Sequence, residues 1–597
     1  MYDTRPKLSK EAEKRRASIP ARPIYTPPTR QPKPPMSFAQ WLGVLLLLMI
    51  LGWFSGWAFS KWTQRNDTPA AAAPKVARIK KLPTITAQYR ADDGPADAAA
   101  AKDTAATFAD KAFGTGPFRP GEVLLRANSD AELQALLARA QAAGGTLLGL
   151  IRGNFGVRFS FPDAASMARF LRGSGQDPAL NPELNYTVTL PTQPDVPTDP
   201  YAPGGLAPFG SQALSYMGVP TDNADWGKGV TVAMLDTGLS PGTPNILKGG
   251  PIAQYDMTTG QSAPGVGHGD MVISLLTGAN GEQGIVPASP IVSVRVLDSN
   301  GQGDVFGVTD GIYTAVDQGA KVLSLSLGTS QPSAMLLAAI DYALSQGVVV
   351  VAAAGNDGNG QISYPAAYPG VVAVGSVDAT GQRATFSNYG NQMDLTAPGV
   401  GINTVTTDGN MSFSGTSASA PLVAGAIAGL LSTNSSMTGQ QAVSLLVQYA
   451  DAAGPVSSNS TANEFYGSGI VDVGRVLNRT DPNYTDLALA DLYLNITSLP
   501  TGGTAPMQVS IQNRGNTMIG QASINVNIGG QLIQQVVTGL QPNEVRAITV
   551  SVPVAPMLSS AGLQVTGQAS MGQYDANMNN NMKSRVVRLI PANSTSP

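Results

Sequence analysis

Residues Val230–Gly238 read VTVAMLDTG, an almost continuous apolar run that ends at an aspartate. Val322–Leu325 and Val348–Ala352 are further runs of the same kind. Such runs are typical of parallel strands that helices cover on both faces. We therefore predict an α/β domain from residue 199 to residue 480, in which strands and helices alternate around a parallel sheet.

The chain has a single histidine, His268, in the sequence GHGD. Asp236 precedes it at the end of the first apolar run, and Ser417 follows in GTSASAP, ahead of a segment of small residues. A serine hydroxyl needs a neighbouring base to act as a nucleophile, and an imidazole can take the proton and return it to a leaving amine. A buried aspartate would hold that imidazole in the required tautomer. These residue types predict a catalytic triad of Asp236, His268 and Ser417.

Asn356, in the sequence AAGND, lies between the histidine and the serine along the chain. Its amide can donate a hydrogen bond to an oxyanion, and one such donor is worth about 10²–10³ in rate. The backbone N–H of Ser417, at the start of a helix, can act as the second donor, because the helix dipole favours negative charge there. We predict an oxyanion hole formed by Asn356 and Ser417.

The order aspartate, histidine, serine is that of subtilisin, and the chain resembles the subtilisin-like serine proteases (subtilase, S8 family) over residues 199–476. The resemblance implies a serine endopeptidase that hydrolyses proteins or peptides and needs no cofactor for catalysis. One departure follows His268-Gly269, where the family commonly has Thr-His-Val and this chain has Asp270-Met271-Val272. The matching segments, in order, are Val232–Gly238, Gly267–Gly269, Leu325–Gly328, Ala354–Asn356, Tyr364–Ala366, Phe386–Gly390, Ala397–Gly399 and Gly415–Ser417.

The resemblance also implies a substrate groove. One stretch would pair with the substrate backbone as an added strand, two glycines would line the opposite side, and small residues would wall the pocket for the residue before the cut. Small walls favour an apolar residue there, and Asp357 at the rim could tolerate a basic one. The stretch that would pair with substrate is Ser326, Leu327 and Gly328, and the two glycines opposite are Gly301 and Gly303. The pocket residues are Ala353, Ala354, Gly355 and Ser363.

Composition narrows the choice of cofactors and partners. Because the chain has no cysteine and one histidine, disulfides are excluded and a zinc site, which needs about four N or S ligands, is disfavoured. Only a hard cation such as calcium is left, and the family's calcium-binding loops have no clear counterpart here. Residues 1–35 carry a net charge of +6 and the remainder −9. An acidic body of this kind does not indicate nucleic-acid binding.

The N-terminal region predicts a membrane anchor. No charged residue occurs between Lys33 and Lys61, and four of the five tryptophans lie in or beside this stretch. About 20 apolar residues suffice to span a bilayer, so residues 36–62 are expected to be a transmembrane helix in contact with lipid. A cleaved signal peptide would have a shorter leader and a shorter apolar run; a buried core helix is the other alternative. The basic tail would face the cytoplasm and the rest the periplasm or the exterior.

The remaining parts of the chain fall into four segments that differ in composition and pattern. Residues 1–35 form a basic, proline-rich tail that could dock a cytosolic partner or only be attracted to anionic lipid. Residues 63–115 indicate a flexible stalk, with a short helix near Ala98–Lys111. Residues 116–198 predict a ferredoxin-like α+β unit that resembles the inhibitory prodomain of these proteases. Residues 484–590 show period-2 strands of a β-sandwich and resemble a CARDB or immunoglobulin-type module.

Two functions follow from these observations. The first is an anchored endopeptidase that cuts itself between Leu190 and Tyr201, as a zymogen would; the α+β unit could instead stay attached as an accessory domain. The second is a catalytically silent scaffold or binding protein that uses a protease fold. A degenerate triad would favour the scaffold, and the sequence retains all three residues.

Overall fold

The computed structural model describes residues 104–151, 156–172, 181–194, 206–258, 267–454, 463–494, 503–557 and 562–587. The predicted tail and transmembrane helix lie outside these residues, as does the stalk before residue 104. Contacts divide the chain into residues 1–98 and 99–597, so everything described below belongs to the second unit.

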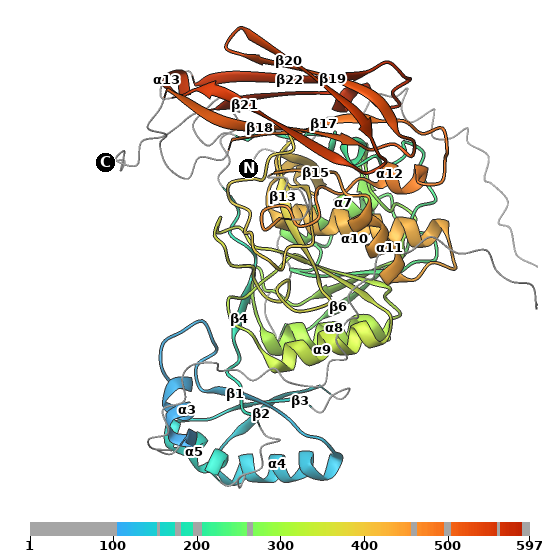
Figure 1. The fold of residues 1–597 in the computed structure, drawn as a ribbon. Coiled ribbons are helices and arrows are strands. Elements are labelled where there is room, and N and C mark those ends of the chain that lie inside the picture. Colours follow the sequence, from blue (N-terminus) through green and yellow to red (C-terminus); the bar gives the residue numbers. More distant parts are fainter. Residues whose placement is uncertain are drawn as a thin grey trace, which may run out of the picture. The chain divides into compact units, whose positions relative to one another are not determined.

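The central element is a seven-stranded sheet in which every described pairing is parallel. Its order is β14-β13-β12-β11-β5-β9-β6 (Figure 1). The predicted parallel sheet is thereby confirmed. The strands are β5 (Val232–Asp236), β6 (Ile252–Asp256), β9 (Ile291–Arg295), β11 (Val322–Leu325), β12 (Val349–Ala353), β13 (Val372–Val377) and β14 (Leu395–Pro398).

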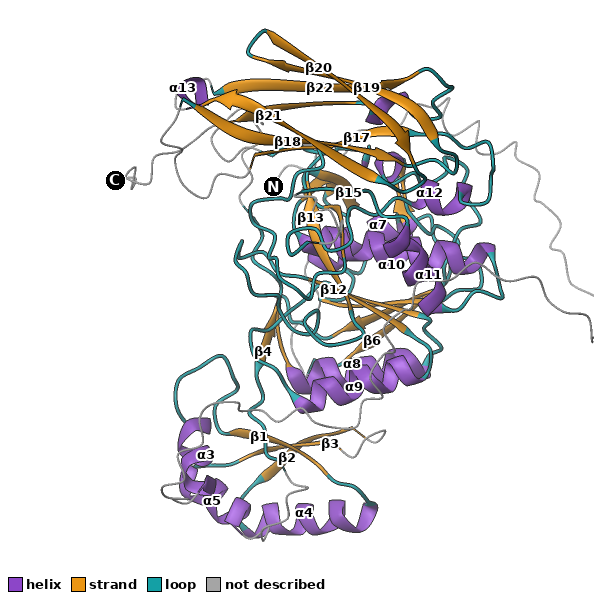
Figure 2. Cartoon of the chain, viewed as in Figure 1, coloured by secondary structure: helices purple, strands orange, loops and turns teal. Residues whose placement is uncertain are grey.

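Helices cover both faces of this sheet (Figure 2). Val232 and Met234 of β5 belong to the core shared with one set of helices, and Ala233 and Leu235 to the core shared with the other. This alternation is the physical reason for the continuous apolar run, because a strand buried on both faces has no solvent-facing positions. The first set is α7 (His268–Thr277), α10 (Thr416–Thr433) and α11 (Gly439–Gln448); the second is α8 (Val305–Asp317) and α9 (Ala334–Ser345).

Helix α10 is long and apolar enough to cross a membrane by length and composition, the one such helix among the described residues. However, 83% of its apolar window is buried inside the protein. Its buried residues pack against β5, β11, β12 and β13. It is therefore the core helix of the α/β domain.

Short elements decorate this domain. A hairpin of β15 (Ile402–Thr406) and β16 (Gly409–Phe413) packs beside α7. The others are α6 (Ala213–Tyr216), a 3₁₀ turn (Thr243–Asn245), β7 (Gly278–Ala279), β8 (Glu282–Gln283), β10 (Gln302–Asp304) and α12 (Val473–Asn478).

The N-terminal unit, residues 104–194, has a three-stranded antiparallel sheet in the order β1-β3-β2. Ser129 accepts the N–H of Glu132 and caps the second helix. The first helix packs against α5, with Ala109 and Ala112 fully buried. The short helix expected near Ala98–Lys111 is thus found at Thr104–Ala112, where it packs within the N-terminal unit. The elements are α3 (Thr104–Ala112), β1 (Glu122–Arg126), α4 (Asp130–Ala142), β2 (Thr146–Ile151), β3 (Gly156–Ser160) and α5 (Ala164–Arg172).

The last strand of this unit, β4 (Thr187–Thr189), does not join that sheet. It pairs with β10 of the α/β domain instead. Within the unit, the preceding residues make only isolated bridges, Leu124 with Glu183 and Phe118 with Tyr186. The ferredoxin-like pattern is thus completed by single bridges rather than by a full fourth strand.

The C-terminal module, residues 484–587, consists of two antiparallel sheets, β17-β18-β21 and β20-β19-β22-β23, that share one hydrophobic core. Gly529 and Gly530 both have positive φ and form the hairpin turn between β19 and β20. The elements are β17 (Leu487–Leu494), β18 (Thr504–Asn513), β19 (Ile519–Ile528), β20 (Gln531–Leu540), β21 (Val545–Pro553), α13 (Val554–Met557), β22 (Leu563–Met571), a 3₁₀ turn (Met578–Asn580) and β23 (Met582–Val587).

Candidate active site

Asp236 and His268 meet at the carboxyl edge of the central sheet. Asp236 is the last residue of β5, and His268 is the first residue of α7. The imidazole Nδ1 lies 2.9 Å from each carboxylate oxygen, and both side chains are buried. Because an ionised carboxylate can only accept, Nδ1 must carry the hydrogen, and this leaves Nε2 free to accept a proton.

Ser417 occupies the second position of α10, where the helix begins after Gly415. Its Oγ and the His268 Nε2 are both buried and have no hydrogen-bond partner among the described residues. Buried polar atoms are nearly always paired, so two orphans in one site call for an explanation. A nucleophile and a base that pair only during reaction supply it. The ring of Phe413 stands edge-on to the imidazole, with centroids 5.2 Å apart.

Asn356 is held in one orientation by the residue that precedes the serine. The backbone N–H and the hydroxyl of Thr416 donate to Asn356 Oδ1 at 2.9 and 2.8 Å. Because two donors contact this atom, it must be the amide oxygen, and the orientation of the Asn356 amide is thereby fixed. Its Nδ2 therefore points away from the helix, and it donates to the carbonyl of Thr192 at 2.9 Å. An amide pre-oriented in this way can stabilise a developing oxyanion without reorganising.

The segment that precedes Thr192 is extended and lies between two backbone segments of the α/β domain, with which it pairs. On one side, β4 pairs antiparallel with β10, with Val188 opposite Gly303, and Leu190 N donates to Gly301 O at 3.0 Å. On the other side, Thr189 and Gly328 exchange both hydrogen bonds at 2.9 Å. Three of the predicted groove residues, Gly301, Gly303 and Gly328, thus bind a peptide backbone directly.

The other predicted groove residues gather nearby but do not all face this peptide. The predicted pairing of Ser326 with substrate concerns its backbone and stays a prediction; its side-chain hydroxyl is buried and donates to the carbonyl of Ser417 at 3.0 Å. Leu327 is fully buried in the core on the α8/α9 side of the sheet. The ladder on this side therefore rests on Gly328, and Ser326 supports the nucleophile's backbone.

Ser363 packs between two of the glycines. A Cβ atom at Gly328 would lie 3.0 Å from the Ser363 Cβ, and one at Gly355 would lie 2.7 Å from the Ser363 Oγ. Ser363 N also donates to Ala354 O at 3.0 Å, and Ala353 ends β12 just before. The predicted pocket residues Ala353, Ala354, Gly355 and Ser363 are therefore brought together.

Asp270 is a site residue whose role was not predicted. Its buried carboxylate accepts from Ser240 N at 3.0 Å, Thr243 Oγ1 at 2.6 Å and Gly267 N at 3.2 Å. It thereby ties the loop after Asp236 to the first turn of α7, which carries His268. The available signal was the departure from the family's Thr at this position. Thr237 adds a second tie, since its hydroxyl accepts from Gly269 N at 3.1 Å.

The N-terminal unit also contacts the start of α9. Glu183 accepts from Ser333 Oγ at 2.6 Å and from Met335 N at 2.9 Å. A carboxylate at a helix N-terminus satisfies N–H groups that have no partner within the helix. Burial nevertheless raises the pKa of Glu183 above its ordinary value.

The start of α8 is held in a similar way. Its capping residue, Asp304, accepts from Gly307 N at 3.0 Å and pairs with Arg158 at 3.3 Å and with Arg119 at 3.4 Å. Both arginines belong to the N-terminal unit, so these pairs fasten that unit to the α/β domain. Within the described ranges, no group of three or more His, Asp or Glu side chains is placed to hold a metal ion.

A parallel sheet with helices on both faces, an aspartate–histidine pair at its carboxyl edge and a buried serine at a helix start define a serine endopeptidase. The chain belongs to the subtilase family (Peptidase S8), and the model of this family matches residues 227–469. It is 39% identical over 250 residues to Subtilisin Savinase of Lederbergia lenta, which covers 41% of this chain and 90% of that protein. It is likewise 39% identical over 242 residues to Thermitase of Thermoactinomyces vulgaris, covering 39% of this chain and 85% of that protein.

Among solved structures, the chain is similar to fervidolysin from Fervidobacterium pennivorans, described as a keratinolytic enzyme related to subtilisin. The TM-score is 0.51 at 18% sequence identity, and the match covers 79% of this chain and 93% of that one. At this identity the likeness concerns the fold alone. It extends over more of the chain than the segment shared with the sequence relatives.

Proposed function

We propose that this subtilase is a membrane-anchored endopeptidase that cleaves proteins outside the cytoplasm through an acyl-enzyme on Ser417. The observation that carries the proposal is the contact of the Thr192 carbonyl with Asn356 Nδ2 at 2.9 Å. That carbonyl belongs to a peptide paired with Gly328 on one side and β10 on the other. It therefore has the backbone pairing and the carbonyl contact that a substrate would need.

In the proposed reaction, Ser417 Oγ attacks the carbonyl carbon of the bond to be cut while His268 Nε2 takes its proton. Asp236 stabilises the imidazolium that forms. The amide of Asn356 and the N–H of Ser417 hold the oxyanion. The intermediate then collapses, His268 returns the proton to the leaving amine, and water repeats the sequence on the acyl-enzyme. Without the held amide we expect about 10²–10³ of the rate to be lost.

The N-terminal unit would be an inhibitory prodomain, and the bond that the enzyme cuts in its own chain would be Thr192–Gln193. The support is the identity of the carbonyl on the Asn356 donor, which is that of Thr192. This cut lies inside the interval from Leu190 to Tyr201 that the sequence indicates. The alternative, a permanently attached accessory domain, would leave this bond intact.

The test compares full-length wild type with Ser417→Ala on a gel and by N-terminal sequencing. Wild type should yield a product that begins at Gln193, and the variant should stay intact. Ser412→Ala, at an exposed serine of β16, should behave as wild type and serves as the matched control. Equal full-length products would refute self-processing, and a product that begins elsewhere would refute the assigned bond.

A fluorophosphonate probe separates the endopeptidase from the silent scaffold. It should label wild type and Ser412→Ala once they have been processed and freed of the N-terminal unit, and fail to label Ser417→Ala or His268→Ala. The scaffold would be supported if a processed sample showed no labelling and no peptide hydrolysis.

The anchor is proposed from the uncharged stretch between Lys33 and Lys61. Full-length Ser417→Ala should pellet with membranes, and removal of residues 36–62 should release it. In cells, a protease added outside should digest the peptidase domain and leave the basic tail protected. Because the cut at Thr192 follows the anchor, the processed wild-type peptidase should appear in the soluble fraction once the N-terminal unit has dissociated from it.

The C-terminal module would be a CARDB-like β-sandwich that caps the peptidase domain. Arg475 of α12 is buried and donates to the carbonyls of Tyr449 and Ala450, and it also contacts Asn543 of the module. Arg514 of the module pairs with Asp451 at 2.8 Å. Removing one partner of a buried ion pair costs about 3–5 kcal/mol. These contacts favour a fixed cap over a loosely tethered binding module.

A further inference from the structure

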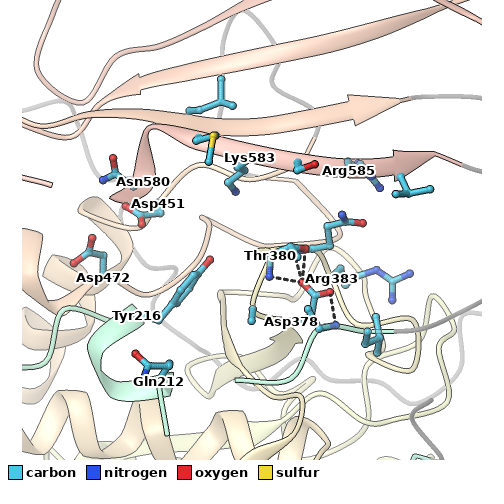
Figure 3. Close-up of a pocket in the computed structure, with 18 of the residues that line it drawn as sticks. Gln212, Tyr216, Asp378, Thr380, Arg383, Asp451, Asp472, Asn580, Lys583 and Arg585 are labelled. Carbon is cyan, nitrogen blue, oxygen red and sulfur yellow. Dashed lines mark hydrogen bonds between the residues drawn. The ribbon is translucent and has the colours of Figure 1, made fainter. Parts of the chain in front are cut away.

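A cavity of about 930 Å³ lies between the peptidase domain and the C-terminal module, away from the triad. Its walls come from Tyr216 and the loop Asp378–Thr385 on one side and from β23 on the other (Figure 3). None of Asp236, His268 and Ser417 lines it. A cavity of this size could hold a small ligand or part of a peptide.

The three carboxylates of the wall already have partners. Asp378 accepts from Ala207 N, from the N–H and hydroxyl of Thr380 and from Gln382 N, at 2.7–3.2 Å. Asp451 pairs with two arginines, and Asp472 accepts from Arg475 N at 2.9 Å. These acids are therefore engaged in holding the protein together.

The three arginines of the wall are engaged as well. Arg514 pairs with Asp451 at 2.8 Å, and Arg585 donates to Leu492 O at 2.6 Å. Arg383 donates to Ala384 O at 3.3 Å and to Ser387 O, and it lies over the ring of Tyr389. Each of the three thus has at least one contact within the protein, through Nη1 in Arg383 and Arg585 and through the ion pair in Arg514.

Lys583 and Tyr216 differ from all of these groups. In the parts of the chain that the structure describes, neither the Lys583 ammonium nor the Tyr216 hydroxyl makes a hydrogen bond or an ion pair. Burial lowers the pKa of Lys583, as expected for an ammonium without a close counterion. A cation in such a place is costly unless an anion joins it.

Both donors converge on Gly381. A Cβ atom at this glycine would lie 2.8 Å from Tyr216 Oη and 3.0 Å from Lys583 Nζ. Both donors therefore pack against the backbone of Gly381, and any side chain at this position would collide with them. Gly381 also has φ of +79°, a conformation that favours glycine.

We propose that this cavity is a binding site for a carboxylate, which Lys583 Nζ and Tyr216 Oη would hold over Gly381. One ammonium and one neutral hydroxyl match a single negative charge. A phosphate dianion would call for a second charge or a guanidinium fork at the same place, and the two donors beside Gly381 supply one positive charge. The carboxylate could belong to a small free acid or to a peptide. Because the two donors come from different modules, a bound carboxylate would also strengthen the docking of the module on the peptidase domain.

The experiment uses the full chain carrying Ser417→Ala, so that neither self-processing nor catalysis affects the result. Succinate, a Glu-containing hexapeptide with an amidated C-terminus, its Gln counterpart and inorganic phosphate are titrated by calorimetry and by thermal unfolding. We expect saturable binding of succinate or of the Glu peptide, one per chain, and an unfolding midpoint that rises with ligand concentration. Succinate alone would identify a small-acid site, and the Glu peptide alone would identify a peptide site.

Variants test the assigned residues. Lys583→Gln should weaken binding by roughly tenfold to a hundredfold, the loss expected for a charge-assisted hydrogen bond. Tyr216→Phe, which removes one oxygen, should weaken it several-fold. Lys228→Gln, at a surface lysine paired with exposed Asp225, should bind as the parent protein does.

Three results would overturn the proposal: no saturable binding of any carboxylate, equal affinity in Lys583→Gln and the parent, or preferential binding of phosphate. If Lys583→Gln failed to fold, unchanged affinity in Tyr216→Phe would overturn it instead. Since the protein tested is inactive, the outcome is independent of the proposed peptidase mechanism.

Discussion

Replacement of Asp270 by alanine should damage both the stability and the catalytic rate of this protein. The buried carboxylate accepts three hydrogen bonds, from Ser240 N, Thr243 Oγ1 and Gly267 N. Alanine would leave these donors without their partner, and at about 1–1.5 kcal/mol for each bond the loss is about 3–5 kcal/mol. At roughly 2–4 °C per kcal/mol for a domain of this size, the midpoint of unfolding should fall by about 10 °C.

The same substitution loosens the link between the loop after Asp236 and the helix that carries His268. A misplacement of about 1 Å in a catalytic group can cost about a hundredfold in rate, so kcat should fall strongly while KM changes little. Asp270→Asn keeps an acceptor for Ser240 N but turns an amide N–H₂ toward Gly267 N, and should be intermediate.

The assay combines thermal unfolding in the Ser417→Ala background with peptide hydrolysis by the processed active enzyme. Asp225→Ala is the matched control, because that carboxylate is 86% exposed and pairs only with exposed Lys228 among the described contacts. Surface pairs of this kind contribute about 0–1 kcal/mol. The reasoning would be refuted if Asp270→Ala unfolded within 1–2 °C of its parent, on the order of the control's shift, and kept its kcat within about twofold.

Asn356→Ala should lower kcat by about 10²–10³ with little change in KM, measured by steady-state peptide hydrolysis; a loss confined to KM would contradict an oxyanion role. Burial raises the pKa of Asp394 to about 6, so its contribution to stability is present below the unfolded pKa and is lost as pH rises through about 6. Asp394→Asn should therefore gain stability over the parent by about 1–1.5 kcal/mol between pH 5 and pH 8, measured by unfolding in the Ser417→Ala background; a difference that did not change with pH would exclude this. Burial also raises the pKa of Glu183 in the docked state, so inhibition by added residues 104–192 should weaken as pH rises through that raised pKa, and Glu183→Gln should flatten this dependence. If inhibition by the parent fragment and by its Glu183→Gln variant depended equally on pH, this role of Glu183 would be contradicted.

The central sheet could be predicted because its chemistry is local. Val232–Leu235 alternates between two helix layers, and a strand buried on both faces favours apolar residues at nearly every position. The meeting of Asp236 and His268 was foreseeable for a similar reason. The aspartate ends such a strand, and the chain offers no second histidine that could take the imidazole's place.

Other features depend on contacts that no local pattern records. Tyr186–Leu190 alternates like any strand, so its pattern alone does not place it; only the resemblance of the unit to a prodomain implied that this strand lies in the groove, where Thr189 pairs with Gly328. Ser326 follows strand β11 directly, yet its hydroxyl supports Ser417 instead of lining the groove. Arg475 resembles a surface residue in the sequence, but it is buried because the carbonyls at the end of α11 satisfy its donors.

The position of the proposed cut has a consequence for activation. The contacts that hold the N-terminal unit, through Glu183, Arg158 and Arg119, all precede Thr192 in the sequence. Cleavage of the Thr192–Gln193 bond would remove none of them, and the strand Thr187–Leu190 would keep its backbone pairs with Gly301 and Gly328. The cut unit would therefore remain as an inhibitor that blocks the groove. Release would need a further event that weakens docking. Such an event could be a second cut within residues 104–192, or the ionisation of Glu183 where it is buried against the start of α9.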